Sequence, residues 1–366
     1  MTEQLRTLLH DKADGVDFAA PDLDRLTADG DRRIRRRRSA VAGGVLSVAL
    51  LVGAVAALGD RGGDDGASVV AHPAPAARDV TWAKGSVIHD GGRAIDVGHE
   101  VRAYVETSVG YVVADTDGHV WSVLDGRVEQ VGTTDVKHPR LVADPAGPLA
   151  AWVSTAGRSG EPDGISWVDQ SRMGGGSARI APRHGASDVD ALSGDTLYLH
   201  DERGAVAHDL STNQERVVDP AGGFESVEGG GVVAAHDGTL AMKADRGTLL
   251  GSSRDHAVLL DQAYGSIGAF SPDGAYYSND ADSPSVWDVR TGKQVPVPGM
   301  DGYAFATGFD WLDDHTLVLI AEQGEGDPML LVTCRIPDGS SCEQAATLGG
   351  LGHPDYQLPV GQPIGE

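Results

Sequence analysis

Hydrophobic residues between positions 80 and 350 occur in runs of about four to eight residues, separated by turn-forming pairs such as Asp-Gly and Gly-Gly. After residue 59, no helical periodicity extends beyond about two turns. Short apolar runs bounded by glycine, proline and aspartate are typical of β-strands joined by tight turns. The pattern therefore predicts an all-β domain over residues 80–349, with a hairpin about every dozen residues.

A strand followed by a turn recurs along this domain. The clearest copy places Trp287 five residues before Gly292. The same frame occurs at Trp121/Gly126, Trp167/Arg172, His208/Asn213, Met242/Gly247, Cys334/Gly339 and, further upstream, Val87/Gly92. From Trp121 onward the frames are spaced by 46, 41, 34, 45 and 47 residues. A period of about 40–45 residues with four strands in each repeat is the sequence signature of a β-propeller.

Each complete repeat is expected to form one four-stranded blade. The strands are clearest in three repeats, at residues 103–109, 111–114, 119–123 and 127–131; 189–192, 196–200, 205–209 and 215–218; and 267–271, 275–278, 285–289 and 294–297. A further hairpin at residues 85–90 and 93–97 precedes the six complete repeats. We expect a seventh blade, in which residues 356–360 of the C-terminal segment 350–366 join this hairpin, because closing the ring removes exposed strand edges. A six-bladed ring with the hairpin packed alongside is the alternative.

One repeat carries two recognisable motifs. Residues 270–274 are Phe-Ser-Pro-Asp-Gly, and residues 286–292 are Val-Trp-Asp-Val-Arg-Thr-Gly. Together they resemble the repeat of WD40 and TolB-like propellers. The other repeats keep the spacing but have different residues at these positions. The motif residues are Phe270, Pro272, Asp273, Gly274, Trp287 and Asp288. We expect the fixed φ of proline and the left-handed conformation open to glycine to shape the turn, and Phe270 to pack between blades.

An uncharged segment of small and apolar residues occupies positions 39–59. As a helix it spans about 31 Å, which matches the hydrocarbon core of a bilayer. An arginine-rich run precedes it and consists of Arg32, Arg33, Arg35, Arg36, Arg37 and Arg38. By the positive-inside rule we predict one transmembrane helix, with residues 1–38 in the cytoplasm and the propeller outside the cell. A cleaved signal peptide is the alternative, although the region before the segment is long and acidic in its first part.

The predicted span divides the chain into unlike parts. Residues 1–38 are expected to form a short, largely disordered tail, and residues 60–79 a flexible linker. This layout resembles a group of actinobacterial single-pass, membrane-anchored propeller proteins, which implies a plasma-membrane protein with an extracellular propeller. The net charge of −25 has its acidic excess after the span. It argues against a nucleic-acid binder, because such a protein needs a basic face.

The two cysteines, Cys334 and Cys342, lie symmetrically about Asp338. A hairpin that turns at Asp338 places them opposite each other, at a distance that a disulfide spans. Because the predicted location is oxidising, we expect them to form a disulfide. No CxxC spacing indicates a redox function.

No sequence motif fixes a catalytic mechanism: the nucleophile elbow, the P-loop, the dinucleotide-binding fingerprint and HExxH are all absent. A propeller can bring acids from several blades to its central channel, and the candidates are Asp115, Asp117, Asp144, Glu228, Asp273 and Asp310. Each has a simpler interpretation as a turn residue. His208 fills a repeat position taken elsewhere by Trp or Met, which favours packing over catalysis.

Residues 115–118 begin like a calcium-binding loop, but Leu124 stands where that loop requires a glutamate. We therefore predict no catalytic residue, no metal site and no cofactor. If channel acids do converge, Ca²⁺ is the ion that they would suit.

A binding module is the function that these features favour, namely a membrane-tethered extracellular propeller that contacts a protein or a cell-envelope ligand. Two alternatives remain open. One is a propeller hydrolase or lactonase that uses channel acids with Ca²⁺. The other is a transmembrane sensor or anti-sigma-like regulator in which residues 1–38 bind a cytoplasmic protein.

Overall fold

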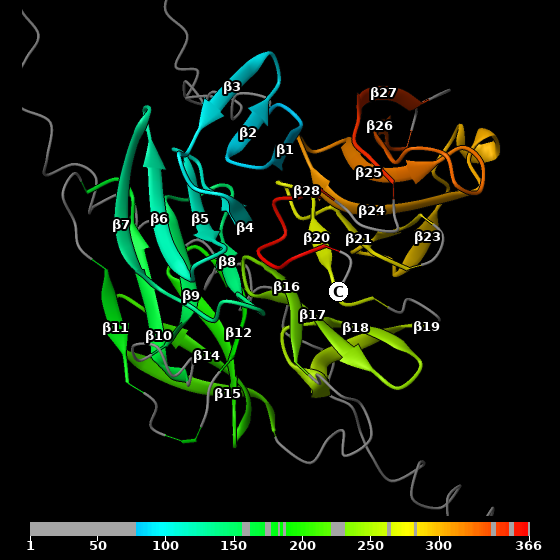
Figure 1. The fold of residues 1–366 in the computed structure, drawn as a ribbon. Helices are drawn as coiled ribbons and strands as arrows, with labels where there is room; N and C mark the ends of the chain where they lie inside the picture. The colour runs from blue at the N-terminus through cyan, green and yellow to red at the C-terminus, as the bar shows by residue number, and fades with distance from the viewer. Residues whose placement is uncertain are drawn as a thin grey trace, which may run out of the picture. The chain divides into compact units, whose positions relative to one another are not determined.

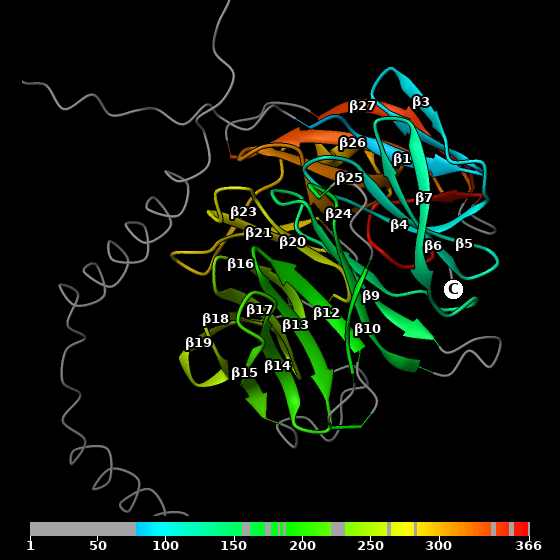
Figure 2. The ribbon, with the colours of Figure 1, turned by 90° about the vertical axis from the view of Figure 1, so that its left-hand side faces the viewer.

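A computed structural model describes residues 78–155, 162–172, 177–181, 184–185, 188–220, 231–261, 265–281, 284–337, 342–350 and 355–364. These residues form seven four-stranded antiparallel sheets, arranged as blades around a common centre (Figure 1; Figure 2). The predicted all-β propeller with seven blades is confirmed, and the six-bladed alternative is wrong. The predicted tail, the arginine run, the predicted span at 39–59 and the linker up to residue 77 lie outside the described residues.

No helix in the described part of the chain is long and apolar enough to cross a membrane.

Six blades are formed by consecutive strands, each beginning at the centre. Blade 1 consists of β4 (Val101–Glu106), β5 (Tyr111–Asp115), β6 (His119–Leu124) and β7 (Arg127–Thr133). Blade 2 consists of β8 (Leu141–Ala143), β9 (Leu149–Thr155), β10 (Pro162–Asp169) and β11 (Ala178–Ile180). Blade 3 consists of β12 (Asp188–Ser193), β13 (Thr196–Asp201), β14 (Gly204–Asp209) and β15 (Gln214–Pro220).

The second half of the ring follows the same order. Blade 4 consists of β16 (Val232–His236), β17 (Thr239–Ala244), β18 (Gly247–Gly251) and β19 (Ala257–Asp261), with the 3₁₀ turn η2 (Arg254–His256) before β19. Blade 5 consists of β20 (Gly268–Phe270), β21 (Tyr276–Asn279), β22 (Ser285–Asp288) and β23 (Lys293–Val295), followed by η3 (Met300–Gly302). Blade 6 consists of β24 (Phe305–Trp311), β25 (Thr316–Glu322), β26 (Leu330–Arg335) and β27 (Cys342–Thr347).

Blade 7 is shared between the two ends of the described chain. Its strands are β28 (Tyr356–Gln357), β1 (Thr81–Lys84), β2 (Val87–Asp90) and β3 (Arg93–Asp96), in that order. β28 pairs with β1, placing Ala83 opposite Gln357 and Lys84 opposite Tyr356. The predicted closure of the ring by the C-terminal segment is confirmed. The prediction lacked β1, which lies between the predicted linker and the predicted hairpin.

Seven hydrophobic clusters hold the described blades together, one at each junction between neighbours. At the junction of blades 5 and 6, Val286 packs with the buried Trp311 and Leu317. At the junction of blades 6 and 7, Tyr356 and Leu358 pack with strands of blade 6. Each fully buried large side chain contributes about 1.5–3 kcal/mol. The core is therefore a ring of seams between sheets, and the C-terminal segment forms one of them.

The motifs that suggested the fold behave as expected in blade 5. Gly274 adopts φ +71°, and a Cβ there would lie 2.4 Å from a ring carbon of His236. Trp287 is buried in the cluster between blades 4 and 5, and Phe270 packs against it. The Asp288 carboxylate accepts hydrogen bonds from the Thr291 hydroxyl and main-chain N–H, which lower its pKa. These residues are structural determinants of the blade.

The repeat frame identified the third strand of a blade at every copy except one. Trp121, Trp167, His208 and Cys334 lie on β6, β10, β14 and β26, which are all third strands. Met242 lies on β17, the second strand of blade 4, so the predicted strand and turn are present there but belong to a different strand of the blade. The reason is local: residues 239–247 are also an apolar strand followed by a turn ending in glycine.

Cys334 and Cys342 form the predicted disulfide. They face each other across β26 and β27, with a Cα–Cα distance of 4.4 Å. Asp338, the predicted centre of the turn, lies outside the described residues. The bond joins the two outermost strands of blade 6.

Candidate functional site

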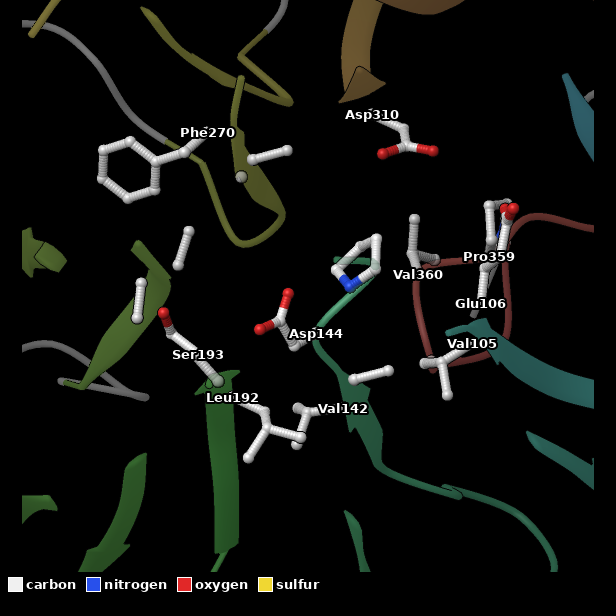
Figure 3. Close-up of a pocket in the computed structure, with 18 of the residues that line it drawn as sticks. Val105, Glu106, Val142, Asp144, Leu192, Ser193, Phe270, Asp310, Pro359 and Val360 are labelled. Carbon is white, nitrogen blue, oxygen red and sulfur yellow. The ribbon is translucent and has the colours of Figure 1, made fainter. Parts of the chain in front are cut away.

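The propeller encloses a cavity of about 760 Å³ at its centre. Residues of the inner strands β4, β8, β12, β16, β20 and β24 and of their following turns line it, together with residues 359–362. Figure 3 shows apolar side chains from several blades, among them Val105, Leu192 and Phe270, and carboxylates of Asp144 and Asp310. A cavity of this size with apolar walls and a few polar groups has the dimensions of a ligand pocket.

The chain after β28 turns back and forms one wall of this cavity. Val360 makes an antiparallel bridge with Val105, which pairs the free inner edge of β4. The Gly361 N–H donates to the Tyr104 carbonyl at 2.9 Å, and the Gly361 carbonyl accepts from the Leu141 N–H at 2.9 Å. Gly361 has φ +72°, and a Cβ there would lie 1.9 Å from the Leu141 carbonyl oxygen. Only glycine therefore fits where this segment crosses from blade 1 to blade 2.

Arg78 connects three parts of the ring at the edge of the cavity. Its guanidinium donates to Glu106 of blade 1 at 2.8 and 3.2 Å and to Asp310 of blade 6 at 2.9 and 3.3 Å. It also donates to the Trp311 carbonyl at 3.1 Å. The side chains of Arg78, Glu106 and Asp310 are only 18%, 12% and 17% exposed. Burial raises the pKa of Glu106, and the Arg78 hydrogen bonds and charge oppose that rise.

Two of the predicted channel acids reach the cavity. Asp310 lines it and is bound by Arg78. Asp144 also lines it, and its carboxylate accepts from the Ala146 N–H at 2.9 Å and from the Gly194 N–H of blade 3 at 2.7 Å. Both carboxylates therefore have structural partners that tie neighbouring segments together.

The other predicted acids do not join them. Asp115 ends β5 and Asp117 lies in the turn that follows, and neither lines the cavity. Asp273 accepts hydrogen bonds from the Ser271 hydroxyl and the Ala275 N–H within its own turn. Glu228 lies outside the described residues. The convergence of acids from many blades, on which an acid-based catalytic site depends, is thus limited to Asp144 and Asp310 among the predicted residues.

Asp190 is a cavity residue that the sequence did not reveal. It sits at a bulge in β12, where the pairing with β13 shifts between Val189 and Ala191. Burial raises its pKa to about 7, and Asp188 adds to the rise, while a hydrogen bond from the Val232 N–H opposes it. A β-bulge re-aims a side chain, and no composition or motif at this position signals that in advance.

His208 is packed, as its repeat position suggested. It is 1% exposed, and its Nδ1 lies 3.2 Å from Glu215 Oε1. Glu215 also binds Arg203, which pairs with Asp201. This network joins strands of blade 3 and lies away from the cavity.

Comparison with known proteins finds similarities to solved structures at low sequence identity. No protein-family model and no curated protein matches the chain. Among solved structures, apo AztD from Citrobacter koseri aligns over 76% of this chain and 88% of its own, with 13% identity and a TM-score of 0.43. TolB from Acinetobacter baumannii aligns over 77% of this chain and 66% of its own, with 13% identity and a TM-score of 0.42. A nidogen/laminin complex aligns over 71% of this chain, with 11% identity and a TM-score of 0.41.

The chain folds as a seven-bladed β-propeller. The seven sheets themselves establish this architecture, and similarities at such low identity concern the fold alone. The predicted resemblance to propeller repeats is therefore confirmed at the level of the fold.

Proposed function

We propose that this protein is a membrane-tethered extracellular propeller that acts as a binding module for a protein or a cell-envelope ligand. The observation that carries the proposal is the central cavity of about 760 Å³, in which apolar wall residues alternate with carboxylates held by structural partners. Such a lining suits non-covalent recognition, since fixed polar groups orient a ligand and apolar walls bury it.

The tether in this proposal rests on the uncharged segment at 39–59 and the arginine run before it. Protease added to intact cells tests the topology. Digestion of residues 80–366 with protection of residues 1–38 is the expected result. Protection of the propeller in intact cells, with digestion after lysis, would contradict it.

Site-specific photo-crosslinking in cells tests the binding function. A photoreactive residue at Ala146, which is exposed at the cavity, is expected to capture one defined envelope component. The same residue at Glu129, exposed on the outer strand β7, serves as the matched control. Capture from both positions alike, or from neither, would count against recognition at the cavity.

A further inference from the structure

Two histidines and two aspartates converge on one face of blade 1, outside the cavity. Asp115 ends β5, Asp117 lies in the following turn, and His119 begins β6. One ligand atom from each of these three residues lies within 4.8 Å of the others. His99 comes from the connection between β3 and β4, and its Nδ1 lies 3.8 Å from Asp115 Oδ2. Residues from two separate segments thus meet at one carboxylate oxygen.

The Asp115 carboxylate is held in a fixed direction. Its Oδ1 accepts from the Asp117 N–H at 2.9 Å and from the His119 N–H at 2.8 Å. Its Oδ2 accepts from the Trp121 indole N–H at 2.8 Å. The residue is 3% exposed. Supporting hydrogen bonds of this kind orient the ligands of protein metal sites.

The imidazole rings are positioned by the same tryptophan. His99 stacks on Trp121 with ring centroids 3.8 Å apart and an interplanar angle of 15°. His119 meets the edge of Trp121 at 6.0 Å. The Nδ1 of His119 lies 3.3 Å from Asp115 Oδ2, the oxygen that His99 also faces. The His99 and His119 side chains are 39% and 42% exposed, so the cluster is open to ions from solvent.

The number of partners at Asp115 Oδ2 favours a cation between these groups. The Trp121 indole N–H occupies one lone pair of Asp115 Oδ2. The other lone pair faces the Nδ1 atoms of both His99 and His119. A hydrogen bond engages only one imidazole there, whereas a metal ion binds both nitrogens and the oxygen together. Tetrahedral ligands about 2.0–2.1 Å from an ion lie about 3.4 Å apart. The 3.3 Å separation already fits that geometry. His99 lies 3.8 Å from Asp115 Oδ2 and outside the group of ligand atoms that are all within 4.8 Å of one another, so its imidazole must move closer to become the fourth ligand.

We propose that His99, Asp115, Asp117 and His119 bind a divalent transition-metal ion of the Zn²⁺ type. Two neutral imidazoles and two carboxylates match the charge of a divalent cation. Imidazole nitrogen suits Zn²⁺, Co²⁺, Ni²⁺ and Cu²⁺, whereas Ca²⁺ and Mg²⁺ take oxygen ligands. The site differs from the calcium loop considered for residues 115–118, because both histidines replace the missing glutamate as ligands. It is independent of the proposed recognition at the cavity.

Calorimetric titration with Zn²⁺ tests this assignment on the purified full-length chain, after a chelator has removed bound metal. The absorption spectrum of bound Co²⁺ is a second readout. Wild type is expected to bind one Zn²⁺ that His99→Ala and His119→Ala each weaken by at least tenfold. The double variant should lose the tetrahedral Co²⁺ absorption. His256→Ala removes an exposed imidazole next to Asp255 on η2 and should bind as wild type does.

Both histidines are exposed enough that the variants should fold, which circular dichroism and thermal unfolding will verify. Three results would overturn the proposal. They are the absence of Zn²⁺ binding to wild type, unchanged Zn²⁺ affinity in the folded double variant, and saturation by Ca²⁺ at the same concentrations as Zn²⁺.

Discussion

Removal of the Arg78 side chain should destabilise the closed ring more than removal of any exposed arginine. Arg78→Ala deletes every hydrogen bond that the guanidinium makes to Glu106, Asp310 and the Trp311 carbonyl. It leaves two poorly exposed carboxylates without their cation. Breaking a fully buried ion pair costs about 3–5 kcal/mol, and partial access of water reduces this to about 2–3 kcal/mol. The unfolding equilibrium should therefore shift by about 30- to 150-fold.

The destabilisation should depend on pH in a direction that follows from Glu106. Burial already raises the pKa of this carboxyl, and the loss of Arg78 raises it further. A carboxyl whose pKa is higher in the folded state stabilises that state below its unfolded pKa, and this stabilisation is lost as pH rises through the folded pKa. The difference between wild type and Arg78→Ala should thus be larger at pH 7.5 than at pH 4.5.

Urea denaturation of the full-length chain, followed by tryptophan fluorescence, measures both effects. Arg172→Ala is the control, because Arg172 is 76% exposed and, among the residues that the structure describes, forms its ion pair with Asp169. Its loss should cost no more than about 0.5 kcal/mol. Adding Glu106→Gln to Arg78→Ala should recover part of the stability, since it removes one unpaired charge. Equal losses in Arg78→Ala and Arg172→Ala, or a loss that is the same at both pH values, would refute the reasoning.

Three further predictions concern other parts of the ring. Gly361→Ala should lower the free energy of unfolding by about 2 kcal/mol or more and Gly126→Ala by about 1 kcal/mol, because both positions have positive φ but only Gly361 has a carbonyl oxygen where the Cβ would lie. The melting temperature should therefore fall further in Gly361→Ala, and equal shifts in scanning fluorimetry would contradict this. Cys334→Ala with Cys342→Ala should cost about 2.5 kcal/mol from the loss of a short closed loop, and a reductant should destabilise wild type but not the variant. Asp190→Asn should flatten the dependence of stability on pH, since the raised pKa of Asp190 makes wild type lose about 2–3 kcal/mol as pH rises from about 5 to about 7. An unchanged pH profile in that variant would show that Asp190 is not the responsible group.

Local patterns predicted most of the propeller because each blade is built from short-range features. The strands at residues 111–115, 119–124 and 196–201 begin and end within a residue or two of the predicted bounds. Their pairing partners follow directly along the chain, so a strand and a turn specify each hairpin. The position of Met242 on a second strand shows the limit of that reasoning. The second and third strands of a blade have similar lengths, and their places in the sheet relative to the centre distinguish them.

The features that shape the candidate site depend on contacts far apart in sequence. Arg78 and Asp310 are separated by 232 positions. The bulge that places Asp190 depends on how β12 pairs with β13, and the residue types around it carry no sign of it. In the same way, His99 belongs to one glycine-histidine pair and His119 to another. Their approach to Asp115 follows from the position of the connection between blades 7 and 1, which a sequence pattern does not contain.

Because β1 pairs with β28, the ring can close only after translation has reached β28. A ribosome makes β1 among the first described strands and reaches β28 about 270 residues later. At about 5–20 residues per second, the inner edge of β1 waits about 14–54 s for its partner. During that time β1 exposes unpaired backbone groups that another nascent chain can bind. We therefore expect production of this protein to depend on protection of β1 until β28 has been made.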